Sequence, residues 1–187
     1  MHLFRSYFNY VNNPEQALHQ LLEECSFWQA CVGYLAAAVS WVLFFNVSGG
    51  TSVLALFFKI AVMFVAELTA GCFVASFCGL FLDFMRVKTS PVKLFVLVGS
   101  AGFIKGLLIA FALIAAALPS AKLGWLAPLA LLTVLGLQLG YLTRSVKRAY
   151  DVSYGKALGA WLLAGVPACV ALVLLSVFLV WGITLLF

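Results

Sequence analysis

The chain has few charged side chains, and this scarcity excludes a soluble globular fold. Aspartate, glutamate, lysine and arginine make up 9% of its 187 residues, whereas 65% of the residues are hydrophobic. An ordinary soluble domain carries about 25% charged residues. A soluble protein of this length has no means of burying so much apolar surface, so we expect the chain to lie in a lipid bilayer.

Histidine is scarce and the signatures of catalysis are missing. The two histidines, His2 and His19, precede the first apolar run and lack the spacing of metal ligands. The five cysteines form no CxxC pair, which argues against a metal site or a disulfide framework. HExxH, GxSxG, Walker and GxGxxG motifs are absent. We therefore expect a non-enzymatic protein with no metal and no cofactor.

The sequence contains five long apolar runs. They occupy approximately residues 27–47, 53–82, 94–118, 126–143 and 157–187. A helix of about 20 residues crosses a hydrocarbon layer of about 30 Å, so each run is close to or beyond that length. Backbone groups in lipid must be hydrogen-bonded internally, and the runs lack the alternation of barrel strands. The prediction is an all-α integral membrane protein, with a bundle of five transmembrane helices in one membrane domain over residues 27–187.

Residues 1–26 are interpreted as a cytoplasmic amphipathic arm. Apolar residues recur at helical spacing in its first half, at Phe4, Tyr7, Phe8 and Val11. This spacing predicts a short interfacial helix, with a disordered tail as the alternative. Asn13, Pro14 and Glu15 are typical of a helix start, and they predict a second amphipathic helix over residues 14–24.

Positive charges gather in the arm and in the loops after the second and fourth runs. Those of the two loops are Arg86, Lys88, Lys93, Arg144, Lys147, Arg148 and Lys156. Arg5 lies in the arm, and the opposite side has Lys122. Because cytoplasmic loops are enriched in lysine and arginine, the N-terminus is predicted to be cytoplasmic. Five spans then place the C-terminus on the far side of the membrane. The net charge of +5 reflects this topology, and we expect no nucleic-acid binding.

Small residues recur at four-residue spacing on three runs. They are Gly71, Ala75 and Gly79 on the second, Gly102 and Gly106 on the third, and Gly136 and Gly140 on the fourth. Such stripes let helix backbones approach closely, so we expect them to pack within the bundle or against a second copy of the chain. Pro167 lies inside the last run, where its missing N–H predicts a kink.

Two ionisable residues, Glu67 and Lys105, lie well inside the second and third runs. A rise of about 1.5 Å per residue places them about 22 Å and about 16 Å from the cytoplasmic ends of these runs. A lysine side chain spans that offset, and unpaired charges are costly in hydrocarbon. We therefore predict a buried Glu67–Lys105 ion pair, either for helix packing or for binding an ion or headgroup. The alternatives are a Lys105 that snorkels towards the cytoplasm and two residues that do not pair.

Parts of the chain resemble the Yip family, membrane proteins named for interacting with Ypt/Rab GTPases. Residues 13–18, NPEQAL, before Phe27-Trp28 resemble the family's NPxxAF…W element, and residues 150–157, YDVSYGKA, resemble its hGLSxxxA element. The run that begins at Leu94 resembles the central helix of the family. The DLYGP element of eukaryotic members is absent, and residues 99–105 replace their GY…P element. The resemblance implies five spans and a bacterial-type member, and therefore an inner-membrane protein with its N-terminus in the cytoplasm and its C-terminus on the periplasmic side.

The expected function is to organise membrane proteins or lipids by binding them. The expected partners are the bilayer, a membrane protein or second copy of the chain, and anionic headgroups, which attract each nearby basic residue by about 1 kcal/mol. The alternative is a small transporter or channel component with Glu67 and Lys105 on a polar path. A third hypothesis is a trafficking adaptor. A water-filled cavity at Glu67 favours transport, and a dry bundle favours the organiser.

Overall fold

The structure is a computed structural model that describes residues 27–46, 52–117 and 126–186, with the side chains described up to residue 174. Its helices are α3 (Phe27–Phe45), α4 (Val53–Phe84), α5 (Pro91–Ala101), the 3-10 helix η1 (Gly102–Gly106), α6 (Leu107–Ala117), α7 (Ala127–Tyr150) and α8 (Tyr154–Leu186). Because α5, η1 and α6 follow one another without a gap, the helices form five segments long and apolar enough to cross a membrane. The predicted all-α, five-span fold is confirmed. The predicted amphipathic helices of residues 1–26 lie outside the described residues.

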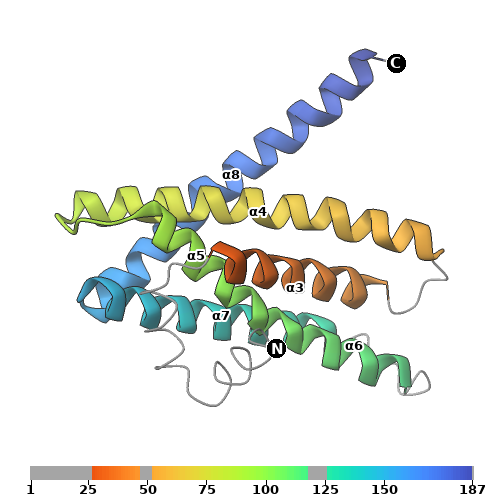
Figure 1. The fold of residues 1–187 in the computed structure, drawn as a ribbon, viewed down its shortest axis with the longest axis horizontal. Coiled ribbons are helices and arrows are strands. Elements are labelled where there is room, and N and C mark those ends of the chain that lie inside the picture. Colours follow the sequence, from red (N-terminus) through yellow and green to blue (C-terminus); the bar gives the residue numbers. More distant parts are fainter. Residues whose placement is uncertain (1–26, 47–51, 118–125, 187) are drawn as a thin grey trace.

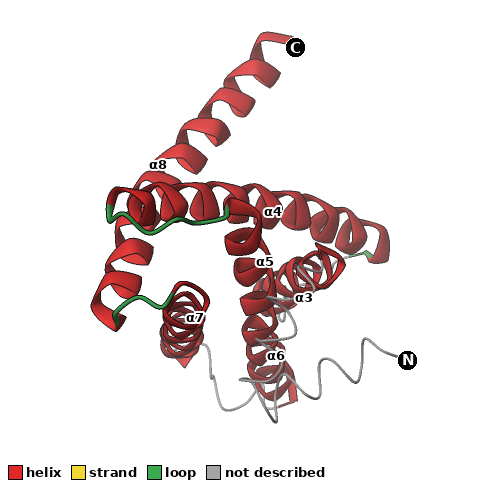
Figure 2. Ribbon diagram, turned by 60° about the vertical axis from the view of Figure 1, so that its left-hand side comes forward, coloured by secondary structure: helices red, strands yellow, loops and turns green. Residues whose placement is uncertain are grey.

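The third span forms the middle of the bundle. Figure 1 shows α3, α4 and α7 with similar directions, and Figure 2 shows α5 and α6 between α3 and α7. In agreement, α5, η1 and α6 all contact both α3 and α7. The last helix, α8, packs on α4 and α7, and its C-terminal end extends away from the other helices (Figures 1 and 2).

Two apolar clusters hold these helices together. The larger joins α3, α4, α5, α7 and α8 through buried side chains such as Tyr34, Leu82 and Val146. The smaller joins α3, α6 and α7 through Phe44, Leu108 and Val134. The outer face of α4 exposes large apolar side chains, as expected of a helix whose solvent is hydrocarbon.

The interior glycines decide how closely the helices approach. A side chain at Gly71 of α4 would overlap the hydroxyl of Tyr34 on α3. A side chain at Gly102 would overlap the carbonyl group of Gly33. A side chain at Gly33 would in turn overlap the carbonyl oxygen of Gly99. Gly71, Ala75 and Gly79 of the second span are all buried, and so is Gly102 of the third.

At Gly106, Gly136 and Gly140 the described residues show no such packing. A methyl group added at any of them would meet no atom of the described residues within 4 Å. Gly136 is exposed on the surface of α7. The physical reason is that four-residue spacing places small residues on one face of a helix but does not determine which face meets a neighbour. Packing of these positions against a second copy stays a prediction.

Pro167 lies inside α8, and the helix continues on both sides of it. Figure 2 shows α8 changing direction as it passes α4. A proline removes one backbone N–H donor and its ring crowds the preceding turn, which produces such a change of direction. The bend separates the part of α8 that packs on the bundle from the part that extends away from it.

Candidate intramembrane charge site

Glu67 and Lys105 meet inside the bundle. Glu67 lies near the middle of α4, and Lys105 belongs to the 3-10 helix η1. The Nζ atom of Lys105 donates to Oε1 of Glu67 at 2.6 Å and to Oε2 at 2.9 Å. The predicted ion pair is therefore present, and the ammonium group contacts both carboxylate oxygens.

The pair is enclosed by the helices around it. The side chains of Lys105 and Glu67 are only 10% and 12% exposed. A charge removed from water loses several kcal/mol of solvation, which a partner restores only when the geometry is good. Contact with both carboxylate oxygens meets that condition, so the two charges compensate one another where water and lipid hardly reach.

An aromatic ring from a third helix completes the site. Nζ of Lys105 lies 5.5 Å from the centre of the ring of Trp41, on α3. The negative face of an indole ring attracts an ammonium group, and the attraction strengthens when water is excluded. The site thus links α3, α4 and the third span. Trp41 was not predicted as part of the site, because it lies four residues before the end of α3, where a tryptophan is ordinarily an interfacial anchor.

The third span changes its winding at this site. The α-helix α5 ends at Ala101, and residues Gly102–Gly106 form η1 before α6 begins at Leu107. A 3-10 stretch inside a longer helix is uncommon and marks a hinge or strain. The sequence pattern predicts one uninterrupted span and gives no sign of this change.

Close packing of α3 against α5 and η1 accompanies the break. Gly33 on α3 faces the carbonyl of Gly99, and Gly102 faces the carbonyl of Gly33. Tyr34, next to Gly33, is fully buried and donates a hydrogen bond of 3.0 Å to the carbonyl oxygen of Phe95. These contacts fix η1 against α3, and therefore fix the position from which Lys105 reaches Glu67. Gly33 and Gly99 stand outside any four-residue stripe of glycines and were not predicted.

The geometry favours a structural pair over a ligand site. Both carboxylate oxygens of Glu67 are engaged by Lys105. Within residues 27–46, 52–117 and 126–186, no group of three His, Cys, Asp or Glu side chains is placed to hold a metal ion. The described side chains therefore offer an incoming ion no free charge at this position unless Lys105 first leaves Glu67.

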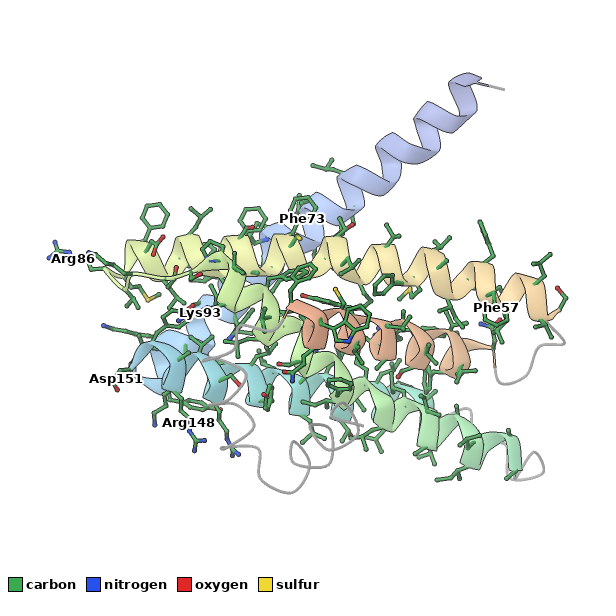
Figure 3. The ribbon with its side chains drawn as sticks, viewed as in Figure 1. Phe57, Phe73, Arg86, Lys93, Arg148 and Asp151 are labelled. Carbon is green, nitrogen blue, oxygen red and sulfur yellow. The ribbon has the colours of Figure 1, made fainter. Side chains whose placement is uncertain are left out.

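The basic residues form a second feature, at one end of the bundle. We use the term basic end for seven exposed residues: Arg86, Lys88, Lys93, Arg144, Lys147, Arg148 and Lys156. Figure 3 shows Arg86, Lys93 and Arg148 at this end and Phe57 towards the other. At the opposite end, Nζ of Lys59 on α4 donates a 2.6 Å hydrogen bond to Asn46, just after α3. The two loops that the sequence predicts on one side of the membrane do lie together.

The fold and these two features define the class: a multi-pass α-helical membrane protein with a compensated intramembrane charge pair. Comparison with known proteins adds no closer relationship, since no protein-family model, no curated protein and no solved structure matches the chain. The resemblance to the Yip family stays a prediction from the sequence.

Proposed function

We propose that this chain is a non-enzymatic membrane protein that organises membrane proteins or lipids by binding them. The observation that supports this proposal is the enclosed Glu67–Lys105 pair, whose side chains are 12% and 10% exposed. Intramembrane charges that serve transport face a water-filled cavity or a pathway. Here the two charges pair with each other, which favours a role in holding three helices in a fixed arrangement.

The surfaces left for a partner are apolar and lateral. The first half of α4 exposes Leu54, Phe57, Phe58, Val62 and Val65. The C-terminal end of α8 extends away from the bundle (Figure 1). In a bilayer these surfaces meet either lipid chains or the helices of another protein. We propose a membrane protein or a second copy of the chain as the lateral partner.

The proposed location is the bacterial inner membrane, with the N-terminus in the cytoplasm and the C-terminus in the periplasm. The concentration of seven basic residues at one end, with Lys59 near the other, supports this orientation through the excess of positive charge in cytoplasmic loops. The sequence elements that resemble the Yip family support a bacterial-type member of that family.

Photo-crosslinking in native membranes tests the proposal. A photoreactive amino acid at Phe57 or Val65, which are 67% and 61% exposed, is expected to yield a discrete adduct with one protein. The matched control is the same residue at Leu82 of the same helix, which is fully buried and should give no intermolecular adduct. Adducts with lipid alone at both exposed positions would contradict a protein partner.

The broken third span favours a second candidate function, a transporter or channel component. Discontinuous helices near the bilayer midplane form substrate sites in several transporter folds, and η1 places Lys105 at such a break. A cysteine at Ala101, which is fully buried beside η1, distinguishes the two functions. Labelling of that cysteine by a small hydrophilic thiol reagent would favour transport, whereas protection from the reagent supports the organiser.

A further inference from the structure

The basic end draws its seven residues from two segments far apart in the sequence. Arg86, Lys88 and Lys93 belong to the α4–α5 connection and the start of α5. The second group lies on α7 and the start of α8 and comprises Arg144, Lys147, Arg148 and Lys156. All seven side chains are exposed. Figure 3 shows labelled members of both groups at the same end of the molecule.

A hydrogen bond holds the two segments together. The hydroxyl of Tyr150, the last residue of α7, donates to the carbonyl oxygen of Ser90 at 3.2 Å and lies 3.4 Å from the backbone nitrogen of Ser90. The α4–α5 connection is itself ordered, because Asp83 accepts hydrogen bonds from the backbone N–H of Thr89 at 3.2 Å and from its hydroxyl at 3.0 Å. The two groups of basic residues are therefore parts of one surface with a defined shape.

The described residues leave this surface strongly positive. Counted without Arg148, six basic side chains and two carboxylates, Asp83 and Asp151, give this end a surplus of four positive charges. The Asp83 carboxylate is already engaged by Thr89. A surplus of this size at the ends of membrane-spanning helices attracts anions, and the anions concentrated at that depth are lipid headgroups.

We propose that the basic end is a single binding surface for the headgroups of anionic phospholipids, and that Tyr150 is a positioning residue of that surface. Two groups of cations held side by side bind several phosphates of one leaflet at once, which free phosphate ions do not reproduce. Arginine and lysine both pair favourably with phosphate oxygens. This inference rests on the proposed function as a membrane-embedded binding protein, and it names the lipid class bound.

The test is a lipid titration of the purified full-length chain in a neutral detergent, with bound lipid counted by native mass spectrometry. The two probes are phosphatidylglycerol and phosphatidylcholine with the same acyl chains. The wild-type chain is expected to bind phosphatidylglycerol about tenfold more tightly, with the difference shrinking as salt is added. Inorganic phosphate at the same concentration should not displace the lipid.

Variants separate charge from positioning. The triple variant Arg86→Asn, Lys88→Gln and Lys93→Gln should lose most of the preference for phosphatidylglycerol; asparagine is chosen because Arg86 has a φ of 64°. Tyr150→Phe keeps every charge and should weaken the preference by about threefold, because the two groups are no longer held together. The matched control is Lys59→Gln at the opposite end, which should leave the preference unchanged.

Equal affinity of the wild-type chain for the two lipids would overturn the inference, and that measurement does not depend on whether any variant folds. A loss of preference in Lys59→Gln as large as in the triple variant would also overturn it, because the preference for phosphatidylglycerol would then not depend on the basic end in particular. An unchanged preference in Tyr150→Phe would remove the positioning role. The crosslinking at α4 is independent of headgroup charge, so a failure here is distinguishable from a failure of the proposed function.

Discussion

At the scale of single residues, the chain shows how charge is held inside a membrane. The ammonium group of Lys105 contacts both oxygens of Glu67 and lies 5.5 Å from the Trp41 ring, so three segments share one charge pair. Breaking a buried pair leaves one charge without compensation, whereas removing both charges leaves none. A variant that removes one charge should therefore lose more stability than a variant that removes both.

The first prediction concerns this pair. Lys105→Met alone and Glu67→Gln alone should each lower the free energy of unfolding by about 3–5 kcal/mol, because each leaves the charge of the other residue buried without a partner. The double variant should recover most of the loss, and a double-mutant cycle by denaturant titration in mixed micelles measures the coupling. Single variants with wild-type stability would remove the pair as a stabilising element.

A second prediction compares two glycines of the same 3-10 helix. Gly102→Ala should destabilise the protein by about 1–3 kcal/mol, because the added methyl group overlaps the carbonyl of Gly33. Gly106→Ala is the matched control: it meets no described atom within 4 Å, and it should be neutral or stabilise by about 0.5 kcal/mol. Thermal unfolding in detergent measures both, and equal losses would contradict the close approach of α3 and η1.

At the scale of elements, two spans depart from a straight helix for different reasons. The third span passes through η1, where close contact with α3 fixes the backbone of Gly102. In α8 the cause is local and readable from the sequence, because Pro167 removes a hydrogen bond wherever the helix lies. A kink with a local cause should disappear when that residue is replaced.

The third prediction tests this. Spin labels at Tyr154 and Leu174, both exposed on α8, would be about 30 Å apart along an ideal straight helix. In a background without native cysteines, Pro167→Ala should lengthen the distance measured by pulsed electron spin resonance and narrow its distribution, because the helix straightens. An unchanged distance would show that packing against α4, and not Pro167, bends α8.

At the scale of the whole molecule, charge is distributed unequally between the two ends of the bundle. The seven residues of the basic end lie on two segments joined by the Tyr150–Ser90 hydrogen bond, whereas Lys59 lies in the first half of α4, towards the other end. If the basic end faces the cytoplasm, every connection of the chain has an assigned side.

The fourth prediction concerns this orientation. In intact cells that express a variant without native cysteines, a cysteine at Lys88 should resist a membrane-impermeant thiol reagent until the membrane is opened. A cysteine at Ser52, the exposed N-cap of α4 at the opposite end, should react at once. The reverse pattern would place the basic end outside.

The sequence by itself determined that the chain is a membrane protein and how many spans it has, and it predicted the pairing of Glu67 with Lys105 as one of three alternatives. Each of these follows from composition or from depth along a helix, since apolar length sets a span and two opposite charges at similar depth attract. Only the tertiary structure decided that Trp41 joins the pair, that the third span breaks at Gly102, and that Gly136 and Gly140 meet no described neighbour. These depend on which faces of separate helices meet, and spacing within one helix carries no information about the face its neighbour presents.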